Sequence, residues 1–147
     1  MNSTNGANGK YKENSWTPPP PPPQPEQAGI PSALEAEASV LGACLLNPDA
    51  LSQVADILGA SDFYRERNSW VFAAMLRLHE RREPPDLVLL TQELERAGKL
   101  GELGGPAYLT ELLLDTPSAF YALHYAGLVR EAAQRRHIIA MAGQFAT

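Results

Sequence analysis

From residue 30 onward, apolar residues recur every three or four positions, which is the spacing of one face of an α-helix. Gly, Pro, Asn and Asp interrupt this pattern and divide it into segments. The segments lie at about residues 32–46, 47–59, 66–82, 86–98, 105–115 and 117–147. "DLVLL" within the fourth segment has strand-forming composition, but "TQELERAG" after it has helical period and charge, which favours helix. The pattern therefore predicts an all-α fold, a small globular helical bundle.

Helix-capping residues stand at the starts of several segments. Ser32 and Glu35 are spaced as a capping box, in which each side chain bonds the other residue's backbone amide. Asn47 is placed to cap the second helix with Pro48 at its first position, and Asp86 to cap the fourth. Two glycines are placed to end the second and fourth helices: Gly59 and Gly98.

The last segment is unusually long. After Pro117 it has no proline and only two glycines, Gly127 and Gly143, which permits one helix of about thirty residues, roughly 45 Å long. The preceding part of the domain should be only ~30 Å across, so we expect the helix to project beyond it. The alternative is a break near Gly127 that folds the helix back onto the domain.

One face of this helix carries an apolar stripe: Tyr121, Tyr125, Leu128, Ala132 and Ile139. Such a stripe on a projecting helix needs a partner, either a further helix of the same polypeptide or a second subunit. We interpret these residues as a protein interface.

Residues 1–29 have no hydrophobic pattern and are rich in Asn, Gly, Ser, Pro and Gln. We predict a disordered tail in which residues 18–25, which include six consecutive prolines at 18–23, form a stiff polyproline II segment. The run contains P-x-x-P, but an SH3-type reader is the weaker hypothesis. The predicted organisation is a tail (1–29), a globular helical domain (30–115) and a long helix (116–147).

Composition narrows the class of protein. The chain has 147 residues, 44% hydrophobic and 20% charged, with a net charge of −5. No apolar run reaches the ~20 residues of a membrane span, so we expect no membrane partner. The net negative charge argues against a domain that mainly grips phosphates. The single cysteine, Cys44, lies among apolar residues and is interpreted as a small buried hydrophobe in a reducing cytoplasm.

No motif for catalysis or cofactor binding is found. "GANGKY" lacks the spacing and the preceding strand of a phosphate-binding loop, and the three histidines show no metal-ligand spacing. We expect neither catalytic residues nor a cofactor in this chain. The compact basic residues are Arg130, Arg135 and Arg136. They are interpreted first as a solvated face, next as ion pairs with a neighbouring subunit, and last as a single-strand DNA contact.

Three blocks of the sequence resemble the N-terminal domain of DnaB-type replicative DNA helicases, over about residues 30–147. The first block matches at Glu35, Ala36, Glu37, Val40, Leu41 and Gly42, with Ala38 where Gln is usual. The second matches at Asp62, Phe63, Tyr64 and Arg65, with Asn68 where His is common. The third matches at Gly104, Gly105, Ala107, Tyr108, Leu109, Thr116, Pro117, Ser118, Val129, Arg130 and Glu131.

The resemblance implies a bacterial, cytoplasmic protein of the replication fork. In that family, a hexameric ring unwinds DNA 5′ to 3′ with ATP and Mg²⁺ bound by a C-terminal motor domain, which also makes the main DNA contacts. The N-terminal domains pair through helical hairpins into a collar that docks the helicase-binding domain of primase, with a helicase loader as a further partner. The last helix would be the first arm of such a hairpin. This chain would then serve oligomerisation and primase docking and would not itself be an enzyme.

Two other functions remain open. The chain can be a free-standing helical adaptor without a motor, or a minor single-strand DNA-binding element that uses the three arginines. A P-loop encoded downstream of Thr147 favours the helicase over the adaptor. DNA binding with steep salt dependence favours the third hypothesis.

Overall fold

A computed structural model describes Pro19 and residues 33–145. In this part of the chain there are six α-helices, one short 3₁₀ helix and no strand, so the predicted all-α fold is confirmed. The elements are α1 (Leu34–Leu46), α2 (Pro48–Ala55), η1 (Ala60–Asp62), α3 (Glu66–Glu80), α4 (Leu87–Arg96), α5 (Pro106–Asp115) and α6 (Ala122–Phe145). The predicted tail and Ser32 of the predicted capping box lie outside the described residues; α1 begins after Ala33, which makes no side-chain cap.

Two of the predicted N-caps are confirmed. The Asn47 side chain accepts a hydrogen bond from the backbone amide of Asp49 at 3.1 Å, and Pro48 takes the first position of α2. The Asp86 carboxylate accepts one from Leu89 at 2.8 Å. Gly98 follows the end of α4 with a φ of +72°, a left-handed conformation that favours glycine.

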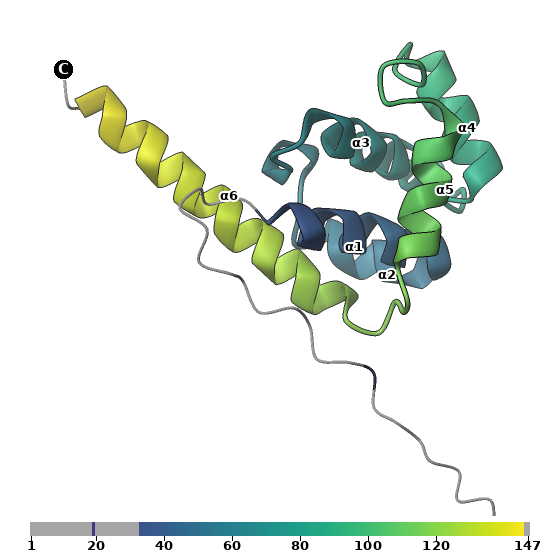
Figure 1. Ribbon diagram of the computed structural model, residues 1–147, viewed down its shortest axis with the longest axis horizontal. Coiled ribbons are helices and arrows are strands. Elements are labelled where there is room, and N and C mark those ends of the chain that lie inside the picture. Colours follow the sequence, from purple (N-terminus) through teal and green to yellow (C-terminus); the bar gives the residue numbers. More distant parts are fainter. Residues whose placement is uncertain (1–18, 20–32, 146–147) are drawn as a thin grey trace, which may run out of the picture.

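Helix α1 is the centre of the fold and is buried on most sides. It contacts α6, α5, α2 and α3, while α4 packs on α3 and α5 (Figure 1). Its fully buried side chains include Val40, Leu41 and Cys44, which join Phe72, Met75 and Leu109 from the surrounding helices in one core. Because α1 contacts four other helices, its position decides how the others lie relative to one another.

Gly42 sits where α1 and α5 come closest. A Cβ atom at Gly42 would lie 2.6 Å from the Cβ of Thr116 and would also overlap the carbonyl oxygen of Leu112. The Thr116 hydroxyl donates a hydrogen bond of 2.8 Å to that same carbonyl. Only the absence of a side chain at Gly42 therefore allows α1 to approach the end of α5 this closely.

The predicted boundaries of three helices need correction. The last helix begins at Ala122, not at Pro117, because residues 116–121 form a connection between α5 and α6. In this connection the Ser118 hydroxyl oxygen accepts a hydrogen bond of 3.0 Å from the backbone amide of Phe120. Such local side-chain bonds compete with helix formation. The second helix ends at Ala55, before Gly59, whose amide instead donates to the Asp62 carboxylate at 2.8 Å and starts η1. The third ends at Glu80, since Arg82 has a φ of +59°.

Candidate functional site

The first half of α6 belongs to the globular domain. Ala122, Ala126, Val129 and Ala132 are buried, and α6 lies against α1, with smaller contacts to α2 and η1. The small side chains on this face allow α6 to lie close to α1. The core therefore continues past residue 115, where the sequence suggested the domain would end and the projecting helix begin.

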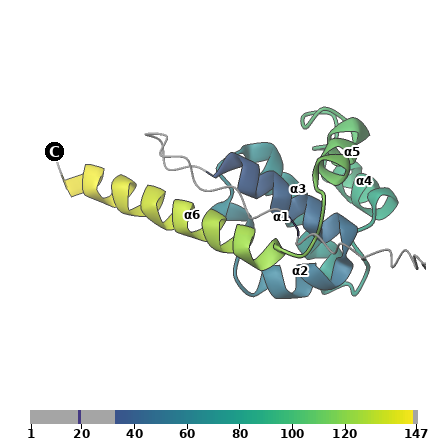
Figure 2. The same cartoon turned by 60° about the horizontal axis from the view of Figure 1, so that its bottom comes forward.

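The second half of α6 leaves the domain. Figures 1 and 2 show the helix continuing past the other elements to its C-terminal end. It runs unbroken through Gly127 over 24 residues, so the predicted alternative of a break at that glycine is wrong. Every side chain at residues 137–144 is exposed, including Ile138 (65%), Ile139 (59%) and Met141 (45%).

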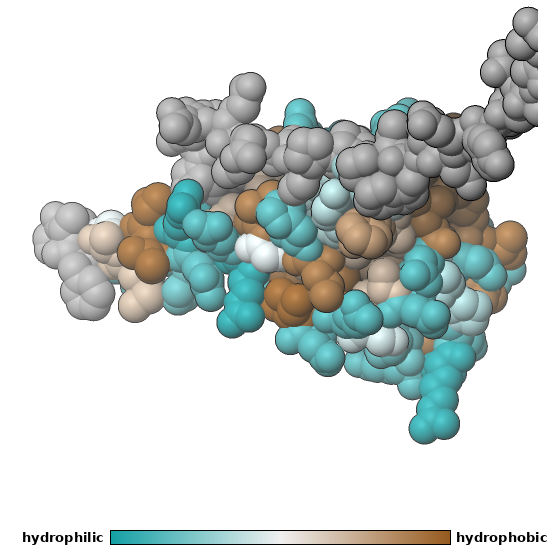
Figure 3. Space-filling model, turned by 90° about the horizontal axis from the view of Figure 1, so that it is seen from below, coloured by the Kyte–Doolittle hydropathy of each residue, from teal (hydrophilic) through white to brown (hydrophobic). Residues whose placement is uncertain are grey.

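This exposed end of α6 is mainly apolar, with the polar side chains His137 and Gln144 at its two ends. After Arg136 no Asp, Glu, Lys or Arg follows in the sequence. Figure 3 shows apolar side chains gathered on the part of α6 nearest its C-terminal end. We call residues 137–144 the projecting end. An apolar helix surface that its own domain does not cover is typical of a protein interface.

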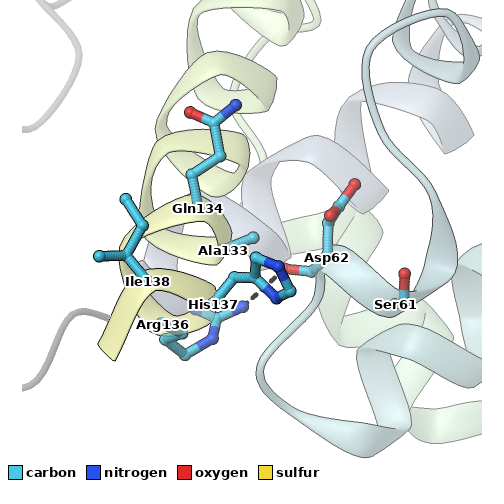
Figure 4. A pocket seen from close by; sticks show the side chains of 7 residues that line it. All are labelled: Ser61, Asp62, Ala133, Gln134, Arg136, His137 and Ile138. Atoms are coloured by element: carbon cyan, nitrogen blue, oxygen red, sulfur yellow. Dashed lines mark hydrogen bonds between the residues drawn. The ribbon is translucent and has the colours of Figure 1, made fainter. Parts of the chain in front are cut away.

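Arg136 binds α6 to η1 just before the projecting end. Its guanidinium donates a hydrogen bond of 2.8 Å to the backbone carbonyl of Asp62 in η1 (Figure 4). The same guanidinium lies 5.3 Å from the centre of the Tyr64 ring. The first contact is made to the last residue of η1 and the second to the connection between η1 and α3, so this segment holds α6 at Arg136.

A buried carboxylate holds that connection in place. Glu37 in α1 accepts hydrogen bonds from the backbone amides of Tyr64 at 2.8 Å and Arg65 at 3.3 Å, the two residues that precede α3, and so ties the start of α3 to α1. It also accepts from the side-chain amide of Asn68 at 3.1 Å, and the oxygen of that amide accepts from the Tyr108 hydroxyl. Burial raises the pKa of Tyr108, which keeps this donor protonated.

A second buried carboxylate joins α3 to α4. The Glu93 oxygens bind Arg77 Nε at 2.8 Å and Arg81 Nη2 at 2.7 Å, with Arg96 at 3.4 Å. Hydrogen bonds from Arg81 and then Arg77 lower the pKa of Glu93 to about 2. Glu93 is therefore ionised at neutral pH, and its role is to stabilise the α3–α4 pair.

The predicted interface residues are divided between two environments. Tyr121, Tyr125 and Leu128 are half-buried at the edge of the face that α6 turns to its own domain, and Ala132 is buried in it. Ile139 alone of the five lies on the projecting end. Sequence reasoning missed Ile138 and Met141, although the lack of charge after Arg136 is a signal that could have found them.

The three predicted basic residues do not form one surface. Arg130 is exposed, Arg135 pairs with Glu131 of its own helix at 2.6 Å, and Arg136 is bound to η1. An isolated i,i+4 pair on a helix exterior is typical of a solvated face.

An open hollow of about 680 Å³ lies between α6 and η1, and Figure 4 shows the residues that line it: Ser61, Asp62, Ala133, Gln134, Arg136, His137 and Ile138. Among the described residues, no three His, Cys, Asp or Glu side chains are grouped to hold a metal ion. Cys44 is fully buried as predicted, and burial raises its pKa to about 12. None of the described helices is both long and apolar enough to cross a membrane.

The chain matches one family model over most of its length. Residues 30–131 match the family model described as the DnaB-like helicase N terminal domain, and the chain belongs to this family. The resemblance noted in the sequence is thereby confirmed.

The similar proteins are replicative helicases. The chain is 43% identical to the replicative DNA helicase DnaB of Geobacillus stearothermophilus over 116 residues, which are 79% of this chain and 26% of the relative. It is 43% identical over 109 residues to that of Mycobacterium leprae, covering 74% of this chain and 18% of the relative. The chain thus spans about a quarter or less of the length of these relatives.

Two solved structures share the fold. The crystal structure of the N-terminal domain of DnaB helicase from Mycobacterium tuberculosis matches with a TM-score of 0.75 at 40% identity, covering 78% of this chain and 81% of that one. The N-terminal domain of Helicobacter pylori DnaB helicase, described together with its interactions with primase, matches with a TM-score of 0.63, covering 75% and 85%. At 23% identity, the second likeness concerns the fold alone.

Proposed function

We propose that this chain is the N-terminal collar domain of a replicative DNA helicase, where it joins subunits of the hexamer and docks primase. One observation carries the proposal: α6 leaves its own domain with a mainly apolar end, on which Ile138, Ile139 and Met141 are exposed. Membership of the DnaB N-terminal domain family supports it, as does the greater length of the relatives.

The contact between subunits is proposed to form along the projecting end. Ile138, Ile139 and Met141 provide apolar area, and the neighbouring residues Ala140, Ala142 and Gly143 are small enough to let a second helix approach. Two helices that pack this way lie 8–10 Å apart, as in ordinary helix bundles. The projecting end would then be the first arm of a hairpin that pairs with a neighbouring subunit.

Two observations support primase docking: a structural relative is described with primase, and the domain has exposed apolar side chains. The Helicobacter pylori domain with the same fold is described with its interactions with primase. Helix surfaces and exposed apolar side chains, such as Leu114 on α5 (76% exposed), provide contact area without a catalytic group. A helicase loader is a further expected partner of the same collar.

The chemistry of unwinding is assigned to another part of the longer protein. ATP and Mg²⁺ would be bound by a motor domain, which would also make the main DNA contacts. The net charge of −5 supports a protein-binding role for this chain over a phosphate-binding one. Its place would be the bacterial cytoplasm, at the replication fork.

Sedimentation of the chain tests subunit association. We expect concentration-dependent dimers that Ile139→Asp weakens at least ten-fold, because a carboxylate would be desolvated in the contact. Leu114→Asp is the matched control, since Leu114 is also exposed but lies on α5. Leu128 is less suitable because it packs against its own core. A strictly monomeric chain, or equal effects of both variants, would overturn the association.

Capture of the helicase-binding domain of primase by the chain tests docking. Retention that survives moderate salt supports the proposal, and no retention at low salt contradicts it. The genomic reading frame past Thr147 separates the helicase from the free-standing adaptor. A stop codon there, with no P-loop pattern following, would favour the adaptor.

A further inference from the structure

Four rings gather where α6 begins. Phe120 and Tyr121 meet edge to face with centroids 5.1 Å apart, and Tyr121 and Tyr125 do so at 6.4 Å. His124 lies 6.0 Å from Tyr125. We call these four residues the aromatic cluster. Phe120 is 76% exposed and Tyr121 and Tyr125 are half-buried, so the cluster presents ring surface to a partner.

One residue from the far end of the chain contacts this cluster. The Tyr121 hydroxyl donates a hydrogen bond of 3.3 Å to the backbone carbonyl of Pro19, 102 positions away. Pro19 is itself partly buried and belongs to the run of six prolines at residues 18–23. A contact across this separation cannot arise from local chain geometry.

The contact between Tyr121 and Pro19 has the features by which aromatic residues bind proline-rich strands. A polyproline II strand makes no internal hydrogen bonds, and its carbonyl groups stay free to accept from outside. Domains that bind such strands do so with aromatic-lined grooves that contact the proline rings. The aromatic cluster provides both parts, ring surface from Phe120 and Tyr125 and a hydroxyl donor from Tyr121.

We propose that the aromatic cluster is a binding surface for a proline-rich strand and that its occupant is residues 18–23 of this same chain. The Pro19 contact identifies the occupant. A covalently linked segment also has a high effective concentration at the cluster, and a proline-rich strand loses little conformational freedom on binding. The proposal stands on these contacts and does not depend on a role in replication.

Binding of this segment would have a consequence for α6. Tyr121 and Tyr125 begin the apolar stripe that leads toward Ile139, so a strand over Tyr121 shields that end of the stripe from a second protein. The proline segment would confine protein contacts to the projecting end.

Paramagnetic broadening in the whole chain tests the proposal. Gln24→Cys places a thiol next to the proline run, and a nitroxide label would react with it alone because Cys44 is fully buried. We expect the label to broaden the amide signals of residues 119–125. Replacing all six prolines by serine should abolish this broadening, and Tyr121→Phe should lower the bound-to-free ratio about five-fold through loss of one hydrogen bond. Leu123→Ala, a change in the same turn but outside the cluster, should leave it unchanged.

Two results would overturn the proposal. Equal broadening in the serine variant would mean that the tether alone brings the label near α6. Broadening of unlabelled, isotope-enriched chains mixed with spin-labelled chains would identify a second copy as the occupant.

Discussion

Gly42→Ala is the sharpest test of how this domain is held together. The new methyl group would lie 2.6 Å from the Thr116 Cβ and overlap the Leu112 carbonyl. The Leu112 carbonyl belongs to the backbone and cannot rotate away as a flexible side chain can, so α1 and α5 must move apart to make room for the methyl group. Overpacking of this kind costs about 3 kcal/mol at the upper end of its usual range. The higher helix propensity of alanine offsets about 1 kcal/mol, which leaves a net loss of about 2 kcal/mol.

Thermal and urea unfolding measure this loss. For a domain of this size, about 2 kcal/mol lowers the Tm by roughly 8 °C. Gly127→Ala is the matched control: it is also a helical glycine, but a Cβ there would meet nothing within 4 Å. That change should raise stability by about 0.5–1 kcal/mol. If Gly42→Ala proves as stable as the native chain, the α1–α5 contact can widen at no cost, and the steric argument fails.

Two further substitutions test the buried polar groups. Glu93, whose pKa is lowered to about 2 by Arg81 and Arg77, contributes stability that is fully present above its ordinary pKa of 4.5 and is lost as the pH falls from about 4.5 toward 2. Urea titrations should show that Glu93→Gln lowers the free energy of unfolding by about 1–2 kcal/mol at pH 7, a value that allows for screening of the partly exposed arginines by solvent. At pH 3 the loss should be much smaller. Equal losses at the two pH values would contradict the assigned role of Glu93. Tyr108→Phe leaves the buried oxygen of Asn68 without its donor and should cost about 1–2 kcal/mol in unfolding by urea, whereas no loss would show that the hydroxyl is dispensable.

Helix existence and most helix starts could be predicted from the sequence. The apolar period, the caps at Asn47 and Asp86 and the stop at Gly98 all act within a few residues of chain, so local spacing carries the information. The start of α6 could not be predicted this way. Residues 116–121 form a connection instead, in which the Thr116 and Ser118 hydroxyls make local hydrogen bonds. These bonds are weak, so the sequence pattern does not distinguish the connection from a continued helix.

The candidate interface was predicted as one stripe and observed as two parts. Helical spacing predicts Tyr121 and Ile139 on one stripe, but Tyr121 precedes the first residue of α6, and spacing does not say which part of the stripe α1 covers. Ala132 is buried in its own domain and Ile139 is not, because α6 continues past the elements on which its first half packs.

The sequence by itself determined that this is a helical chain of the DnaB N-terminal domain family with a long last helix. Only the tertiary structure decided what several family-matching residues do. Glu37 binds the backbone just before α3 from 27 positions away, and Gly42 makes room for the end of α5. Arg136 fastens α6 to a carbonyl 74 positions earlier in the chain. Such partners share no local pattern. They meet only once the helices have packed, and packing brings together residues whose separation in sequence says nothing about their distance.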